Sequence, residues 1–287
     1  MKIIPISFDS MGTRSMATYV ETKDVKIFID PGVSLAPSRY GLPPHKVEIE
    51  KMNRDWEEIV KYALRSDVLV VSHYHYDHHD PNSDLEIYDG KVLLIKHPKE
   101  NINLSQKQRA AYFLEQIRNR PKKIEFADNK EFSFGNTLIR FSKAVFHGTN
   151  PRLGYVIETM VDDGSYRFIH TSDVEGPSIE DQVEFILNNK PNLVFIDGPL
   201  SYMLGFRYSR RSLEESVENL MRIIDECPLE SLVIDHHLLR ELVWRERIKK
   251  AVNYGAKKGI KVISVAEYLG KKPNLLEARR KELYGKK

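Results

Sequence analysis

The chain has 287 residues, of which 41% are hydrophobic, so it is long enough to bury a full core and its composition excludes an extensively disordered protein. Lysine and arginine together exceed aspartate and glutamate by only three, a difference too small to indicate a nucleic-acid partner by itself. The single cysteine, Cys227, excludes an internal disulfide and a multi-thiolate zinc site.

The first ten residues, MKIIPISFDS, contain one lysine and a short apolar run interrupted by Pro5. This pattern fits neither a secretory signal nor a membrane-spanning helix, so we expect a cytoplasmic protein without a membrane partner. The high lysine and glutamate content, with few glutamines, is typical of heat-adapted (thermophilic) proteins. No repeat or low-complexity tract divides the sequence, and we predict one domain over residues 1–287.

Short alternating and β-branched segments predict a β-rich first part of the chain. Strands are expected over residues 2–7, 17–21, 25–30, 67–72, 92–95, 131–134, 138–144, 153–158 and 166–170. Apolar residues at helical spacing predict helices over 54–65 and 105–118, the second of which opens with the possible capping box Ser105 and Gln108.

Helices and strands alternate after residue 178. Helices are expected over 179–188, 213–225 and 239–254, and strands over 193–196, 232–234 and 261–265. Ser178 with Asp181 and Ser212 with Glu215 match the capping-box pattern. Strand meanders followed by this alternation predict an α/β fold, an αββα sandwich in which two mixed β-sheets pack face to face with helices on the outside.

The densest polar stretch is VVSHYHYDHHDP, residues 70–81. His73 and His75 lie two residues apart at the end of a predicted strand, so their side chains point the same way and both can reach one metal ion. Asp77 and His78 follow after a turn and can serve a second ion. Because a catalytic zinc needs three protein groups, this stretch supplies only half of two sites.

The missing groups occur later, each directly after an apolar strand: His147 in FSKAVFHG, Asp173 in FIHTSDVEG, and His236 or His237 in LVIDHHLL. Side chains at successive strand ends converge on one edge of a sheet. We therefore expect these residues to complete the metal site, with the choice between His236 and His237 left open.

Together with Asp30 in FIDPG, these positions resemble the metallo-β-lactamase fold superfamily in order and spacing over nearly the whole chain, closest to an uncharacterised archaeal branch. The resemblance implies that His73, His75 and His147 hold one metal ion, that Asp77, His78 and His236 hold a second, and that Asp173 bridges them. Asp30 would orient a ligand histidine. Pro81 departs from the glycine that many members carry, although Asp80 as N-cap would still allow a helix to begin there.

The predicted function is a dinuclear metal-dependent hydrolase. Two divalent ions, zinc in the first place and manganese or iron as alternatives, would lower the pKa of a bridging water to ~7, and the resulting hydroxide would attack a carbonyl carbon or a phosphorus. Asp77 and Asp30 are candidate catalytic residues, and His237 is a candidate acid on the substrate side. The substrate, a small or anionic molecule, is not specified by the sequence.

Three other functions were weighed. A phosphodiesterase or nuclease acting on nucleotides or nucleic acid is the first, although the chain lacks the long insertion after Asp173 that the nuclease branch with a cap domain carries. The second is another kind of metalloenzyme: an oxygen-reducing di-iron enzyme is disfavoured because that group resembles H-x-E-x-D, and a DHH phosphoesterase is disfavoured because no paired-aspartate motif is visible on an early strand. A non-catalytic, metal-stabilised binding protein with a closed pocket is the third.

Several polar positions near the motifs have two interpretations. Asp197 either lines the site or caps a turn, and the loop Gly205 to Arg211 (GFRYSRR) either binds an anionic substrate or is a solvated loop. His79 is expected to be a solvated neighbour of the ligands. Tyr74 and Tyr76 are expected to pack or to form the pocket wall.

Overall fold

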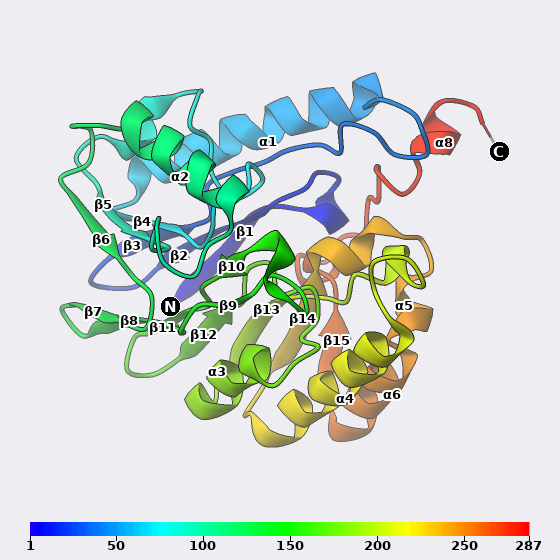
Figure 1. Cartoon of the computed structure of the whole chain (residues 1–287). Helices are drawn as coiled ribbons and strands as arrows, with labels where there is room; N and C mark the ends of the chain where they lie inside the picture. Colours follow the sequence, from blue (N-terminus) through cyan, green and yellow to red (C-terminus); the bar gives the residue numbers. More distant parts are fainter. Residues whose placement is uncertain (287) are drawn as a thin grey trace.

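The computed structural model describes residues 1–286, in which two β-sheets lie face to face between outer layers of helices (Figure 1). The first sheet has the order β1 (Lys2–Phe8), β2 (Met16–Glu21), β3 (Lys26–Ile29), β4 (Val68–Val71), β5 (Val92–Ile95) and β6 (Lys123–Phe126). The second has the order β15 (Lys261–Ile263), β14 (Ser231–Asp235), β13 (Leu193–Asp197), β12 (Arg167–His170), β11 (Thr159–Asp162), β8 (Thr137–Phe141) and β7 (Glu131–Phe134). A small ribbon pairs β9 (Val145–Phe146) with β10 (Tyr155–Val156).

Both large sheets are mixed. In the first sheet β1, β2 and β3 pair antiparallel, whereas β3 to β6 pair parallel. In the second sheet β12 to β15 pair parallel, whereas β7, β8, β11 and β12 pair antiparallel. The parallel segments need crossover connections, and these connections supply most of the helices.

The helices cover the outer face of each sheet (Figure 1). Helices α1 (Lys46–Arg65) and α2 (Leu104–Gln116) lie on the first sheet, and α3 (Asp181–Asn189), α4 (Arg210–Glu226) and α6 (Lys249–Lys258) lie on the second. Shorter elements are α5 (Trp244–Arg247), α7 (Val265–Tyr268), α8 (Arg280–Leu283) and the 3-10 turns η1 (Asp9–Met11), η2 (Leu85–Tyr88), η3 (Pro151–Leu153), η4 (Ser201–Met203) and η5 (His236–Arg240). No helix among the described residues is both long and apolar enough to cross a bilayer.

The core between the sheets joins them into one layered body. Phe8 and Val70 from the first sheet and Phe168 and Phe195 from the second are fully buried in one apolar cluster. The rings of Phe8 and Phe195 meet edge to face with centroids 5.8 Å apart. Each such side chain contributes about 1.5–3 kcal/mol on burial, so the intersheet layer holds the two sheets in a fixed relation. The predicted αββα sandwich of two mixed sheets is confirmed.

Helix α1 begins at Lys46, not near residue 54 as the apolar spacing predicted. The Nδ1 atom of His45 accepts a hydrogen bond from the backbone N–H of Val47, and Glu48 accepts one from the backbone N–H of His45. This arrangement works as a capping box. Histidine is not among the usual N-cap residues, which explains why the sequence pattern missed this start.

The three predicted capping boxes are wrong. Helix α2 is capped by Asn103, whose side chain accepts from the N–H of Gln106, and α4 is capped by Ser209. Helix α3 has no side-chain cap, and Ser178 hydrogen bonds with the hydroxyl of Tyr208 instead. In α2 and α4 another polar residue nearby has the capping geometry, which a spacing rule cannot distinguish.

Other predicted elements differ from the structure. The segment 153–158 contains only the short strand β10, and three strands that were not predicted, β6, β9 and β11, lie elsewhere. The helix expected over 239–254 is divided into η5, α5 and α6. No helix begins at Pro81, because the Asp80 side chain accepts from the N–H groups of Asn82 and Ser83 and forms a local turn.

Candidate metal centre

Two groups of side chains meet where strands of both sheets end. The first group is His73, His75, His147 and Asp173, and the second is Asp77, His78, Asp173 and His236. A smaller third group, Asp173, Asp197 and His237, adjoins them. Within each group the candidate ligand atoms lie within 4.8 Å of one another. All seven predicted ligand positions are therefore brought together, with Asp173 common to both groups.

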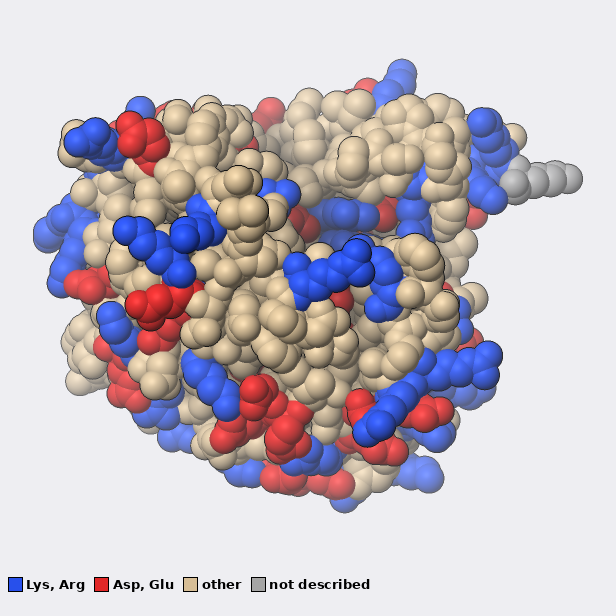
Figure 2. All heavy atoms as spheres, in the orientation of Figure 1, with Lys and Arg blue, Asp and Glu red and all other residues tan. Residues whose placement is uncertain are grey.

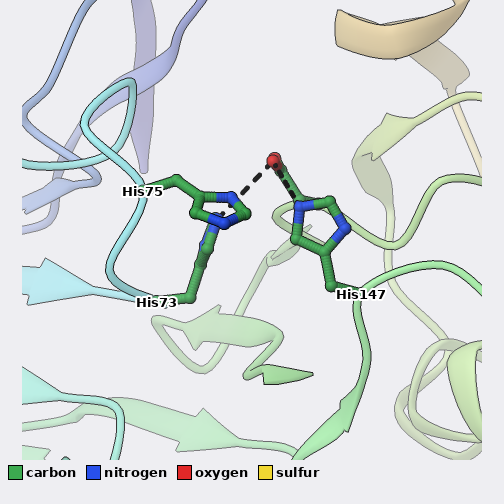
Figure 3. A group of neighbouring side chains, drawn as sticks. His73, His75 and His147 are labelled. Carbon is green, nitrogen blue, oxygen red and sulfur yellow. Dashed lines mark ion pairs between the residues drawn. The ribbon is translucent and has the colours of Figure 1, made fainter. Parts of the chain in front are cut away.

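The carboxylate of Asp173 divides its two oxygens between the groups. Its Oδ2 lies 3.2 Å from Nε2 of His147 and 3.6 Å from Nε2 of His73. Its Oδ1 lies 2.9 Å from Nε2 of His78 and 3.1 Å from Nε2 of His236. Figure 3 shows the rings of His73, His75 and His147 turned into one common space. This is the arrangement expected of a carboxylate between two cations.

Several residues at strand ends in and beside the site have left-handed backbone conformations, which turn their side chains toward it. Asp30, Ser172 and His236 have φ values of 53°, 55° and 59°, respectively. Non-glycine residues rarely adopt such values, and the cost of about 1–3 kcal/mol persists only where the surroundings enforce it. Three of these conformations at one site indicate a backbone shaped by function.

Gly32 permits the loop after β3 to pack against the histidine motif. A Cβ atom at this position would lie 2.3 Å from the backbone nitrogen of His79, well inside any normal contact. The DPG sequence after β3 therefore brings Asp30 directly beside the loop that carries His78.

His78 and His73 are each held through their Nδ1 atom. Nδ1 of His78 donates to Oδ2 of Asp30 at 2.8 Å, and Asp30 also accepts from the backbone N–H and the hydroxyl of Ser72. Nδ1 of His73 lies 3.1 Å from the hydroxyl of Ser72 and 3.3 Å from that of Ser172. These contacts leave the Nε2 atoms of both histidines for the site.

His236 is held by a carboxylate that the sequence analysis did not single out. Its Nδ1 donates to Oδ2 of Asp9 at 2.6 Å, and Asp9 also accepts from Nε of Arg240 at 2.8 Å. Both Asp9 and Arg240 are buried. Asp9 follows strand β1 in the sequence FDS, so the strand-end criterion used for the ligands would have found it, whereas nothing local marks Arg240.

His237 occupies a different environment from His236. Its Nδ1 donates to Oδ2 of Asp197 at 2.9 Å, and its Nε2 lies 3.9 Å from Oε1 of Glu175. The same Asp197 accepts from the backbone N–H groups of Glu175 and His237. Asp197 thus orients His237, and Glu175, another residue that was not predicted, stands 3.5 Å from Nδ1 of His147.

The protonation of the histidines differs between the two groups. Burial lowers the pKa of His73 well below its usual value and that of His75 to about 3, so both are neutral. Burial alone would also lower the pKa of His78, but the carboxylates of Asp173 and Asp30 raise it to about 10. Asp173 and Asp9 likewise raise the pKa of His236 against the effect of its burial.

The donor set fits divalent ions. Among the described residues, Nε2 of His73 is a buried atom without a hydrogen-bond partner, and the buried Nε2 of His78 and Oδ1 of Asp173 meet each other at 2.9 Å. Buried nitrogen and oxygen atoms turned into one space in this way indicate a position for a cation. His236 is the exception, since its Nε2 contacts Nη2 of Arg240 at 3.0 Å. Imidazole and carboxylate ligands suit zinc, manganese and iron.

The site opens into a cavity of about 490 Å³. His75, Asp77, His147 and Asp173 line its floor. Figure 2 shows basic side chains beside and within the hollow between the two halves of the molecule. Two of the candidate ligands, His75 and Asp77, are partly exposed to this cavity, so a small molecule can approach the centre, which a closed, purely structural metal site would not allow.

The remaining predictions for the motif are mixed. Tyr74 is buried, with its hydroxyl bonded to the carbonyl of Lys96, and Tyr76 is 43% exposed in the cavity wall. His79 is not solvated as expected. Its ring is fully buried, donates through Nδ1 to the carbonyl of His75 at 3.0 Å and packs on Phe113.

No protein-family model matches the sequence. A protein of Korarchaeum cryptofilum described as a UPF0282 protein is 56% identical over 284 residues, which cover 99% of this chain and 94% of that protein. A UPF0282 protein of Methanocaldococcus jannaschii is 47% identical over 293 residues, covering 99% and 96%. The chain belongs to the UPF0282 protein family. Its similar relatives in this family are archaeal, as the resemblance implied.

Solved structures confirm the fold of this UPF0282 protein. The metallo-β-lactamase fold protein YhfI of Bacillus subtilis matches with a TM-score of 0.53 and 15% identity, covering 91% of this chain and 90% of that one. An isothiocyanate hydrolase from Delia radicum gut bacteria matches with a TM-score of 0.55 and 15% identity, covering 88% and 94%. At this identity the likeness establishes the metallo-β-lactamase fold alone.

Proposed function

We propose that this UPF0282 protein is a dinuclear metal-dependent hydrolase. His73, His75 and His147 would hold one divalent ion, Asp77, His78 and His236 a second, and Asp173 would bridge them. The observation that carries the proposal is the division of the Asp173 oxygens between two histidine groups at 2.9–3.6 Å. The two ligand groups take residues from the strand ends of both sheets, so neither sheet could form the site alone. We therefore propose that residues 1–287 form a single domain.

Bound zinc, or manganese or iron in its place, would supply a Lewis acid that lowers the pKa of water to ~7 and stabilises a developing oxyanion. The residues of the chain then orient and protect the site. Asp30 and Asp9 fix the rings of His78 and His236 through their Nδ1 atoms. His237, held by Asp197 through Nδ1, faces the cavity. Because burial lowers the pKa of this ring well below its usual value, His237 would first accept a proton at Nε2, from the attacking water, and then hand it to the leaving group.

Metal content tests the first half of the proposal. The purified protein should contain about two zinc-class ions per chain by elemental analysis. His75→Ala should lower this content, whereas His97→Ala should leave it unchanged because His97 lies outside both groups. Absence of metal after reconstitution with zinc, manganese and iron would contradict the proposal.

A substrate screen tests the second half. The metal-loaded protein is assayed against chromogenic phosphodiesters, lactones and thioesters, with Asp77→Asn as the blank. We expect hydrolysis that Asp77→Asn abolishes. Turnover that survives this substitution would show that the two proposed metal ions do not take part in the reaction.

A further inference from the structure

Four arginines line the cavity above the candidate metal centre. Arg14, Arg109, Arg207 and Arg240 line it, against three carboxylates, those of Asp77, Asp173 and Glu175. The cavity of about 490 Å³ is the size of a small-molecule site. The three carboxylates all lie in or beside the proposed ligand groups, so bound divalent ions would neutralise them first.

Two of the four arginines already have partners outside the cavity. Nε of Arg240 is bonded to Asp9 at 2.8 Å. Arg14 forms two parallel hydrogen bonds with Glu277, at 2.6 and 2.7 Å. These bidentate or buried pairs hold their guanidinium groups in place and cancel most of their charge.

The other two arginines have no such partner. Neither Arg109 nor Arg207 has a carboxylate within 4.0 Å among residues 1–286. The guanidinium of Arg109, on helix α2, lies 4.9 Å from the ring centroid of Tyr76. This contact holds the guanidinium of Arg109 at the wall of the cavity that His75 and Asp77 also line.

Arg207 approaches from the second sheet. It lies in the exposed loop between η4 and α4, in the segment GFRYSRR, and lines the same cavity as Arg109. Two unpaired guanidinium groups from different layers thus face one small space. An oxyanion would pair with these two guanidinium groups, whereas a neutral substrate would leave both of them to water.

We propose that the substrate of this site is a small anion whose phosphoryl or carboxylate group is bound by Arg109 and Arg207. This inference rests on the proposed function, because it names the substrate class of the same site. Arg109 and Arg207 set specificity by recognising the anionic group, while Tyr76, Tyr202 and Leu200 provide aromatic and apolar wall for the rest of the molecule. It also assigns a role to the loop Gly205 to Arg211 that the sequence left open.

Calorimetric titration of the metal-loaded, full-length protein with phenylphosphonate tests the inference, since this probe carries the anion on a bond that is not hydrolysed. We expect Arg109→Gln and Arg207→Gln each to weaken its binding by about three- to ten-fold, as for the loss of one hydrogen bond of ordinary strength, because Arg109 is half-buried and Arg207 is exposed to water. Arg109→Lys and Arg207→Lys should recover part of the affinity and control for misfolding. The affinity for the neutral ester diethyl phenylphosphonate should be the same in all variants and in the parent protein.

Arg118→Gln is the matched control, because Arg118 is an exposed arginine just beyond α2 and does not line the cavity. It should bind phenylphosphonate as the parent protein does. A parallel titration with benzoate distinguishes the two kinds of anion: tighter binding of benzoate assigns a carboxylate, and tighter binding of phenylphosphonate a phosphoryl group. Unchanged phenylphosphonate affinity in both glutamine variants would overturn the inference, and elemental analysis of each sample separates that result from a failure to bind metal.

Discussion

Asp30 and His78 are hydrogen bonded at 2.8 Å although 48 positions of sequence separate them. Because Asp30 accepts the Nδ1 proton, the Nε2 atom of His78 must face Asp173, which lies 2.9 Å away. The backbone N–H of Ser72 binds the other oxygen of Asp30 at 2.8 Å and so fixes the carboxylate itself. Asp30 therefore orients a proposed ligand without being one.

Asp30→Asn should weaken metal binding while the fold is retained. An amide in place of the carboxylate no longer fixes the ring, and loss of such a partner typically lowers metal affinity about 10- to 100-fold. Competition with a chromogenic chelator measures the change. Asp55→Asn is the matched control, since Asp55 is a buried, hydrogen-bonded aspartate that belongs to none of the candidate ligand groups. Equal metal affinity in Asp30→Asn and the parent protein would show that the hydrogen bond has no such role.

Gly32→Ala should destabilise the protein and disturb the metal centre together. The added Cβ would lie 2.3 Å from the backbone nitrogen of His79, so the loop after β3 must move away from the histidine motif. Gly41→Ala is the comparison, because its Cβ would meet nothing within 4 Å and it reports only the cost of a positive φ, about 1 kcal/mol. Urea unfolding and metal content are measured on both. Similar losses in the two variants would argue against the steric explanation.

The seven predicted ligand positions could be found from sequence because each follows an apolar strand, and strand ends meet at one edge. The same rule applies to Asp9, which follows β1 and was overlooked. Glu175 and Arg240 carry no such mark. Arg240 reaches Asp9 across 231 positions of sequence, a contact that only the packed sheets create.

The helices and strands likewise divide into those that the local sequence predicts and those that it does not. Strands with strong β-branched character, such as β4 and β13, lie close to their predicted bounds. The start of α1 was missed because His45 is an uncommon cap, and β6 was missed because its sequence KIEF, partly exposed at a sheet edge, has little apolar signal. His79 was misjudged because its burial depends on Phe113 of α2, which is distant in sequence.

Glu158→Gln should make stability less dependent on pH. Glu158 is fully buried and neither of its carboxylate oxygens has a hydrogen-bond partner, so burial raises its pKa well above the usual value. In the unfolded chain a glutamate loses its proton at about pH 4.3, whereas the folded protein keeps Glu158 protonated to higher pH. The contribution of Glu158 to the free energy of unfolding is therefore fully present below about pH 4.3 and is lost as the pH rises toward the folded pKa.

Urea unfolding at pH 5 and pH 8 measures this effect. The free energy of unfolding should fall less between the two pH values in Glu158→Gln than in the parent protein. The exposed Glu115 provides the control, since Glu115→Gln should leave the pH dependence as it is. A pH profile of Glu158→Gln that coincides with that of the parent protein would mean that Glu158 ionises normally in the folded state.

Arg280 ties the C-terminal segment to α1 and to the loop before it, and its removal should be strongly destabilising. Its side chain is fully buried, pairs with Glu48 at 2.8 Å and donates to the carbonyls of Ala36 and Leu42. Arg280→Ala leaves a buried, unpaired carboxylate, which costs about 3–5 kcal/mol. Urea unfolding should show this loss.

The double variant Glu48→Leu, Arg280→Met identifies the cause. It removes both charges and fills the space, so most of the stability lost in Arg280→Ala should return, because an apolar pair avoids desolvating two ions. Metal content should match the parent protein, since neither residue belongs to the two ligand groups. If the double variant is as unstable as Arg280→Ala, the hydrogen bonds of Arg280 to Ala36 and Leu42, and not the unpaired charge of Glu48, hold the C-terminal segment in place.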